Sequence, residues 1–182
     1  MNVVVEKVLM FNPFALLGVE QSFTLDKTEL ENKYLELMKA YHPDKVAGVD
    51  EASQKLAFMT KSTQINDAYN LLKDDVKRGQ ALIDLQKDHA HFNENVVKND
   101  FEFIVLQINL REQAQNLSQN FVEAEFNQLQ EQAKKLTLEN KEALKQAFND
   151  NNLELAQKLV YRLQFLAKLS QEIETLEMNN LF

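Results

Sequence analysis

The chain has 182 residues, of which 45% are hydrophobic and 26% charged, as is typical of a soluble globular protein with one domain or two small ones. A formal net charge of -8 argues against a general nucleic-acid-binding protein, no apolar run is long enough to span a membrane, and the lack of cysteine excludes disulfides and thiolate metal sites. We therefore expect a cytoplasmic protein with no nucleic-acid or membrane partner. With only 3 Gly and 2 Pro, the composition favours an all-α fold.

The first two predicted helices begin at recognisable caps. Residues 12 to 17 have the pattern of a short helix capped by Asn12, with Pro13 at its first position and Gly18 at its end. A longer helix is predicted to start at Asp26, whose side chain can cap the first turn. Its apolar face is formed by residues at spacings of three and four, which are Leu30, Tyr34, Leu37 and Tyr41. The remaining face carries Lys33, Glu36 and Lys39.

A third helix is predicted from about residue 51 to residue 73. Its apolar positions recur every three or four residues and are Ala52, Leu56, Met59, Ile65, Tyr69 and Leu72. The small Ser62 in the middle of this face would let a neighbouring helix approach closely. We therefore expect the second and third helices to form an antiparallel pair, followed by a shorter helix over 76–85.

Between these two helices lies a tight polar turn, Tyr41-His42-Pro43-Asp44-Lys45. Pro43 has no amide hydrogen and disfavours the α conformation at His42, so the preceding helix must end near Tyr41. His42 and Asp44 are thereby held on a loop between two rigid elements. Such a loop is a common place for a binding or catalytic site.

The apolar periodicity lapses over residues 86–98, which we predict to be a linker between a front half, 1–85, and a back half, 99–182. His89 and His91 in this stretch are candidate metal ligands. Histidines two residues apart do not share a helix face, however, and the chain offers no cysteine to accompany them. A solvated linker without a metal ion is the simpler interpretation.

The back half is predicted to contain three helices, and the short connections between them indicate an antiparallel three-helix bundle. The first helix begins with Asn99 as its cap, the second starts near Asn120 and the last near Asn151. Asn140 stands where the apolar stripe of the second helix calls for a hydrophobic residue, so a local bend is predicted there.

Two of these helices have more apolar surface than one inner stripe requires. In the first, one side carries Phe103, Leu106, Leu110, Ala114 and Leu117, and the nearly opposite side carries Phe101, Ile104, Val105, Ile108 and Glu112. In the last, the inner stripe consists of Ala156, Leu159, Leu163, Leu166 and Ile173, and Tyr161 and Phe165 point away from it. An exposed apolar face usually marks a partner site, although packing between the two halves or self-association would also cover it.

The front half resembles a J-domain, the module by which DnaJ-type co-chaperones act on their ATPase chaperone, with its core over residues 12–78. That resemblance rests on Leu30, Tyr34, Leu37, the loop from Tyr41 to Lys45, and Ile65-Asn66-Asp67-Ala68-Tyr69 followed by Leu72. The whole chain resembles the HscB family, the J-proteins of bacterial iron–sulfur cluster assembly. This closer match is carried by Asn12-Pro13-Phe14-Ala15-Leu16-Leu17-Gly18, Leu110-Arg111-Glu112 and Arg162-Leu163-Gln164-Phe165-Leu166.

The resemblance implies a co-chaperone with two binding sites and no cofactor or metal. Its front half would engage an HscA-like ATPase chaperone and accelerate ATP hydrolysis through His42, Pro43, Asp44 and Lys45, with Lys33 and Lys39 on the adjoining helix as further docking residues. Its back half would bind an IscU-like iron–sulfur scaffold protein. Carried over by position, that second site comprises Ile104, Val105, Ile108, Glu112 and Phe165.

Two other interpretations stay open from the residues alone. In the first, the protein is a J-protein whose back half serves a different client or only dimerisation. In the second, His42 beside Asp44 acts in a hydrolase, but the sequence ties no serine or cysteine nucleophile to it by spacing. We therefore predict a binding protein that is not an enzyme.

Overall fold

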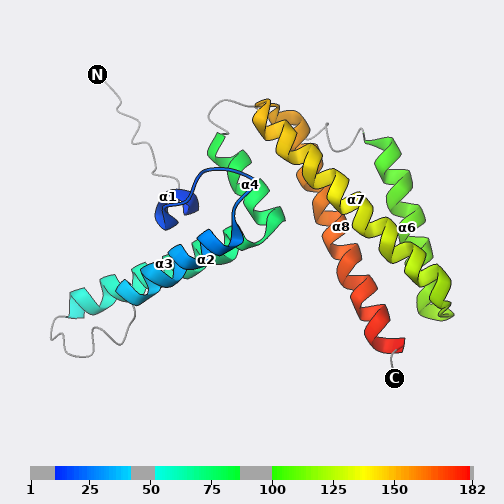
Figure 1. Cartoon of the computed structure of the whole chain (residues 1–182), viewed down its shortest axis with the longest axis horizontal. Coiled ribbons are helices and arrows are strands. Elements are labelled where there is room, and N and C mark those ends of the chain that lie inside the picture. The colour runs from blue at the N-terminus through cyan, green and yellow to red at the C-terminus, as the bar shows by residue number, and fades with distance from the viewer. Residues whose placement is uncertain (1–10, 42–51, 87–99, 181–182) are drawn as a thin grey trace, which may run out of the picture. The chain divides into compact units, whose positions relative to one another are not determined.

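The computed structural model describes residues 11–41, 52–86 and 100–180, and these form helices and connecting loops without a β-strand, which confirms the all-α prediction. By its internal contacts the chain divides into two compact units, Met1–Asp88 and His89–Phe182. The first contains α1 (Pro13–Leu17), α2 (Lys27–Tyr41), α3 (Ala52–Lys73) and α4 (Asp75–Gln86). The second contains α6 (Phe101–Gln119), α7 (Glu123–Asn149) and α8 (Leu153–Asn180) (Figure 1).

Helix boundaries in the first unit follow the predicted caps. The Asn12 side chain accepts a hydrogen bond from the Ala15 amide at 3.1 Å, and Gly18 ends α1 in the left-handed conformation with φ of 67°. Asp26 Oδ1 accepts from the amides of Thr28 and Glu29 at 2.7 and 3.2 Å. These contacts satisfy backbone donors that a helix start otherwise leaves without partners.

The helices α2 and α3 form an antiparallel pair, as predicted, and lie side by side in Figure 1. Three contacts fix the direction, because the residue numbers rise along α2 while they fall along α3. The Tyr34 hydroxyl donates to Asn66 Oδ1 at 2.8 Å, the Ser62 hydroxyl lies 3.8 Å from Met38 Sδ, and the rings of Tyr41 and Phe58 have centroids 5.6 Å apart; Tyr34 also stacks on Tyr69 at 4.1 Å. The small Ser62 is buried at this interface, which is consistent with its predicted role.

The apolar stripe predicted for α3 is wrong at its N-terminal end, because Leu56 and Met59 are both more than half exposed. At this end α2 contacts Phe58 rather than Met59, and Tyr41, which makes that contact, is the last residue of α2. The stripe is buried further along α3, at Ile65, Ala68 and Leu72, where α1 and α2 both pack on it. Periodicity alone could not show where the cover by α2 ends.

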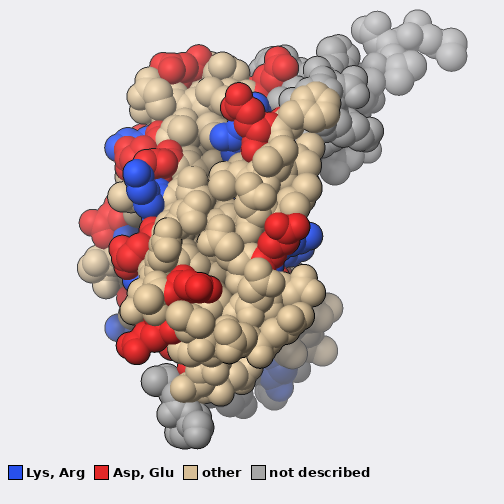
Figure 2. All heavy atoms as spheres, turned by 90° about the vertical axis from the view of Figure 1, so that its right-hand side faces the viewer, with Lys and Arg blue, Asp and Glu red and all other residues tan. Residues whose placement is uncertain are grey.

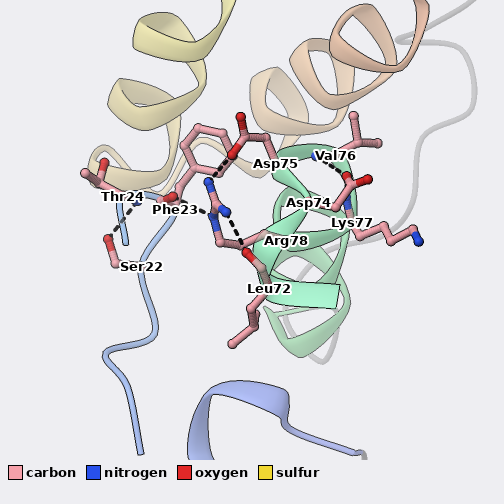
Figure 3. A network of polar contacts seen from close by, with 9 residues as sticks. All are labelled: Ser22, Phe23, Thr24, Leu72, Asp74, Asp75, Val76, Lys77 and Arg78. Atoms are coloured by element: carbon pink, nitrogen blue, oxygen red, sulfur yellow. Dashed lines mark hydrogen bonds and ion pairs between the residues drawn. The ribbon is translucent and has the colours of Figure 1, made fainter. Parts of the chain in front are cut away.

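A buried arginine joins the loop before α2 to the connection between α3 and α4 (Figure 3). Arg78 Nε donates to the Phe23 carbonyl at 2.8 Å, one terminal nitrogen donates to the Leu72 carbonyl at 2.6 Å, and the other donates to the Asp75 carboxylate. The guanidinium also lies over the Phe23 ring, 5.1 Å from its centroid. Arg78 therefore ties three separate segments of the first unit together with one side chain.

In the second unit α6 and α8 run in the same direction, because Asp100 pairs with Arg162 and Phe103 with Phe165 further along both helices. α7 runs opposite to both (Figure 1). A continuous core lies between these helices, and its largest members are Phe103, Leu110, Leu117, Phe126, Leu129, Phe165, Leu166, Leu169 and Ile173. α7 is one uninterrupted helix through Asn140. The Asn140 amide is buried and donates to the Leu159 carbonyl at 2.9 Å, so this polar residue makes a hydrogen bond between helices.

Candidate functional site

The predicted chaperone-binding loop, His42, Pro43, Asp44 and Lys45, lies outside the described residues. Its N-terminal support is described, because Tyr41 ends α2 and contacts Phe58 of α3. On the same helix Lys39 is exposed and Lys33 is half-buried, and neither forms an ion pair within the described part of the chain. Both lysines are therefore at least partly accessible to an acidic partner. No contact among the described residues joins one lysine to the other.

The exposed apolar face predicted for the back half is present on α6. Its buried side consists of Phe103, Leu110, Ala114 and Leu117. On the other side Phe101, Val105 and Ile108 are 71%, 57% and 52% exposed, Ile104 is half-buried and Glu112 is exposed. We call Ile104, Val105, Ile108 and Glu112 the α6 face. The two-sided prediction for this helix is thus confirmed, and within the described chain no other helix covers the α6 face.

The side of the molecule on which α6 lies in Figure 1 faces the reader in Figure 2. Uncharged side chains form a broad area there, and acidic side chains stand around it in greater number than basic ones (Figure 2). A protein that docks on this side must therefore accept a largely uncharged surface with an acidic border.

The exposure predicted for Phe165 is wrong. The side chain is only 7% exposed, its ring meets the Phe103 ring edge-on at 5.8 Å, and the Arg111 guanidinium lies 5.4 Å from its centroid on the other side. The reason is that α8 packs against α7 and α6 at once, so it buries two stripes where we expected one. Tyr161, by contrast, is exposed as predicted. Phe165 lies beneath α6 and supports the α6 face from inside the bundle.

An ion-pair cluster that sequence reasoning missed attaches the start of α6 to α8. Asp100 occupies the N-cap position, one residue later than the predicted cap Asn99, which lies outside the described residues. Its side chain does not cap the helix. Instead it is 4% exposed and accepts hydrogen bonds from Arg162 at 2.6 and 2.7 Å, with Lys158 Nζ at 3.1 Å. Asp100 and Arg162 are 62 positions apart, so no local pattern in the sequence connects them.

This cluster holds the Asp100 carboxylate in its charged form. Burial by itself would raise the pKa of Asp100, but the hydrogen bonds and positive charges of Arg162 and Lys158 outweigh burial and hold the pKa below its ordinary value. The Asp100 carbonyl also accepts from the Ile104 amide at 2.9 Å, so the same residue starts the first turn of α6. The cluster therefore fixes the end of the helix from which the α6 face begins.

Replacing Asp100 by asparagine is expected to destabilise the second unit by about 2 kcal/mol near neutral pH, because the buried bonds to Arg162 lose their charge assistance. A carboxyl whose pKa is lowered on folding contributes stability above its unfolded pKa of roughly 3.9, and that stability is lost as the pH falls through the lower folded value. The difference between wild type and Asp100→Asn should therefore be full at about pH 7 and shrink below about pH 4, as measured by urea unfolding. The control is Glu102→Gln, which alters an exposed acid on the same turn. A difference that does not depend on pH would contradict this account.

Comparison with known proteins places this geometry in a family. Residues 12–81 match the DnaJ domain, and residues 99–174 match the HSCB C-terminal oligomerisation domain. The co-chaperone protein HscB homolog of Haemophilus influenzae is 33% identical over 168 residues, which cover 92% of this chain and 96% of that protein. The chain belongs to the HscB family of co-chaperones. Co-chaperone protein HscB of Proteus mirabilis is 34% identical over 170 residues, covering 90% of this chain and 94% of that protein.

Solved HscB structures share the fold. The chaperone HscB from Vibrio cholerae superposes with a TM-score of 0.81 at 28% identity, covering 92% of this chain and 98% of that chain. Human co-chaperone protein HscB superposes with a TM-score of 0.79 at 22% identity, covering 92% of this chain and 83% of that chain, and it supports the fold alone. The HscB-family chain is thus a J-protein co-chaperone, as its resemblance to the J-proteins of iron–sulfur cluster assembly predicted. Co-chaperones of this kind act on an Hsp70-type chaperone, and the family is not one of known enzymes.

Neither a metal site nor a membrane-spanning helix is found within the described residues of this HscB-family member. No group of three or more His, Cys, Asp or Glu side chains within 11–41, 52–86 and 100–180 is arranged to hold a metal ion. His89 and His91, the candidate ligands in the predicted linker, lie outside these ranges. No helix in the described chain combines the length and apolar character needed to cross a membrane.

Proposed function

We propose that this protein stimulates the ATPase of an HscA-like chaperone with its first unit and delivers an IscU-like iron–sulfur scaffold protein to that chaperone with its second unit, in the service of cluster assembly and transfer. Membership of the HscB family supports the co-chaperone role. The observation that carries the delivery step is the α6 face, an uncovered apolar surface in the second unit, whereas the predicted chaperone-binding loop belongs to the first. Two units with separate surfaces suit a protein that brings two others together.

For the first unit, the proposal assigns the chaperone contact to His42, Pro43 and Asp44, with Lys45, Lys39 and Lys33 as flanking cations. The aromatic contacts Tyr34 to Tyr69 and Tyr41 to Phe58 hold α2 firmly on α3 up to the last residue before the loop. A rigid support of this kind lowers the ordering cost of binding. Because Glu36 lies between the two helical lysines, we expect only modest electrostatic steering toward an acidic chaperone surface.

For the second unit, the proposal assigns the scaffold contact to the α6 face. Val105 and Ile108 supply most of its exposed apolar area, Ile104 contributes the half of its surface that is accessible, and Glu112 adds one negative charge. Apolar area lost from water drives association, and a charge at the border fixes register and excludes wrong partners. Phe165 is not a direct contact in this proposal, since its ring is already enclosed by Phe103 and Arg111.

Replacing Val105 and Ile108 together by serine is expected to weaken scaffold binding at least roughly ten-fold, because both lie near the centre of the α6 face and serine removes their apolar surface. Isothermal titration of an IscU-like scaffold protein measures this loss. Stimulation of chaperone ATPase by the variant without scaffold should equal that of the wild type. Leu138→Ser serves as the matched control, since Leu138 is a mostly exposed leucine of α7 outside the α6 face. Equal affinity of the double variant and the wild type would show that the α6 face is assigned wrongly.

Self-association is the second candidate role of the back half, and it is favoured by the same uncovered apolar face together with the description of the matching family domain as an oligomerisation domain. In that case the wild type sediments as a dimer and the Val105→Ser, Ile108→Ser variant as a monomer. A wild type that is monomeric and binds the scaffold through the α6 face leaves delivery as the function.

A further inference from the structure

A groove with charged and amide side chains along an apolar base runs between α6 and α8. It has a volume of about 650 Å³ and is open along its length to solvent. The charged residues along it are Arg111 on the α6 side and Lys168 and Glu172 on the α8 side, and Gln115 and Gln171 also line it. Its carbon floor is formed by Ala114 and Leu176. The groove is thus a lined channel on the bundle surface, with two cations, one acid and neutral amides.

The two cations of this groove lack carboxylate partners within the described chain. The protein has three arginines: Arg78 is held by Asp75 and Arg162 by Asp100, whereas Arg111 rests only on the Phe165 ring. Lys168 is exposed and likewise forms no ion pair with a described residue. The Arg111 guanidinium therefore lies over an aromatic ring, a contact that does not use its N–H groups, so these groups can bind a ligand.

The chemistry of the lining indicates what the groove takes. A guanidinium fork binds a carboxylate with two parallel hydrogen bonds, and an ammonium group nearby adds a second positive charge. Glutamine amides both donate and accept, so they suit the alternating N–H and C=O groups of an extended peptide. The groove lies along the C-terminal halves of α6 and α8, so it has no helix N-terminus with free N–H groups of the kind that phosphate sites use. The lining therefore matches a peptide with acidic side chains better than a phosphorylated small molecule.

Position along α6 links this groove to the proposed scaffold site. Arg111 follows Ile108 by three residues and precedes Gln115 by four, so one turn of the helix carries the chain from the α6 face to the groove. We infer that the α6–α8 groove binds an extended, carboxylate-bearing segment of the scaffold protein whose apolar part sits on the α6 face. This inference rests on the proposed function of the second unit. Glu172 repels a carboxylate placed next to it and so favours a segment whose acidic residues lie opposite Arg111 and Lys168.

The test is isothermal titration of an IscU-like scaffold protein into full-length variants at low and at high salt. Lys168→Gln is expected to weaken binding about three-fold at low salt and to reduce the dependence of affinity on salt, because one attractive charge is removed from the groove. Glu172→Gln should strengthen binding by a similar factor, since a repulsive charge is removed. The matched control is Lys134→Gln, which removes the same charge from an exposed site on α7 and should leave the affinity unchanged.

Lys168 carries the test because its side chain is exposed and holds no other residue in place, so its replacement leaves the fold intact. Arg111→Lys adds a second arm: it keeps the charge but removes the fork, and a loss of affinity would support a bound carboxylate. Unchanged affinity in Lys168→Gln and Glu172→Gln, in a protein whose binding still depends on Val105 and Ile108, would overturn the groove alone. If the wild type does not bind the scaffold at all, the proposed function and the groove both fail.

Discussion

A His42→Gln variant is expected to lose stimulation of the HscA-like ATPase completely while remaining folded. His42 follows the last residue of α2 and precedes Pro43, which disfavours the helical conformation at His42. Glutamine keeps a polar side chain of similar length but replaces the imidazole ring and its two nitrogens. If the ring itself contacts the chaperone, this loss has no local compensation. The measurement is the steady-state ATPase rate of the chaperone at saturating co-chaperone.

Two controls separate a lost contact from a lost fold. Circular dichroism should give the same thermal transition for His42→Gln and wild type, and scaffold binding through the second unit should be unchanged. Lys39→Gln removes one exposed charge from the last turn of α2, so it should raise the concentration needed for half-maximal stimulation several-fold without lowering the maximum. Stimulation by His42→Gln at the wild-type level would remove the loop from the mechanism.

The helices of this protein were largely predictable, because each carries its own local signal. Asp26 caps α2 as its position before the apolar pattern indicates, and the amides it binds are those of the first turn. The two-sided character of α6 is also a local property, readable from residue spacing, and Phe101, Val105 and Ile108 are exposed as that spacing predicts. Membership of the HscB family was likewise predictable from short motifs in both units.

Errors arose where the answer depends on which helices surround a residue. Phe165 falls off the inner stripe of α8, and only the position of α6 across from it shows that this second face is covered. Leu56 and Met59 follow the α3 stripe, yet α2 contacts this end of α3 through Phe58 and not through them. A helical periodicity states that a face is apolar, but the neighbouring helices decide whether that face is buried.

Long-range polar contacts were beyond sequence reasoning for a related reason. Asp100 lies among charged and polar residues that a single sequence reads as solvated, and its partner Arg162 belongs to a distant helix. Arg111 and Arg162 both occur in motifs that the HscB family shares, so the motif was visible while the roles were not. The structure separates those roles: Arg162 fixes the start of α6, and Arg111 stands beside the groove and binds no carboxylate of the described residues.

An Arg78→Ala variant is expected to destabilise the first unit by about 3 to 5 kcal/mol, the largest stability loss that a single substitution should produce here. Its removal takes away the Arg78 donors that now bind the carbonyls of Phe23 and Leu72 and the Asp75 carboxylate, and it also removes the cation from the Phe23 ring. Arg78→Lys should recover only part of the loss, because one ammonium group cannot reach three acceptors that a planar fork reaches at once. Lys77→Ala, at the exposed neighbouring position, is the control and should cost under about 0.5 kcal/mol.

Tyrosine fluorescence during urea unfolding can assign the Arg78→Ala loss to the first unit. The chain has no Trp and 4 Tyr, of which Tyr34, Tyr41 and Tyr69 lie on α2 and α3 and Tyr161 lies on α8. The fluorescence transition should therefore move to lower urea in Arg78→Ala, while scaffold binding, which depends on α6, should be unchanged at low urea. Chaperone stimulation by Arg78→Ala should decline at a lower temperature than stimulation by the wild type, since the proposed chaperone-binding loop directly follows α2. If Arg78→Ala lost scaffold binding at the same low urea concentration at which its fluorescence changed, Arg78 would support the whole chain rather than the first unit alone.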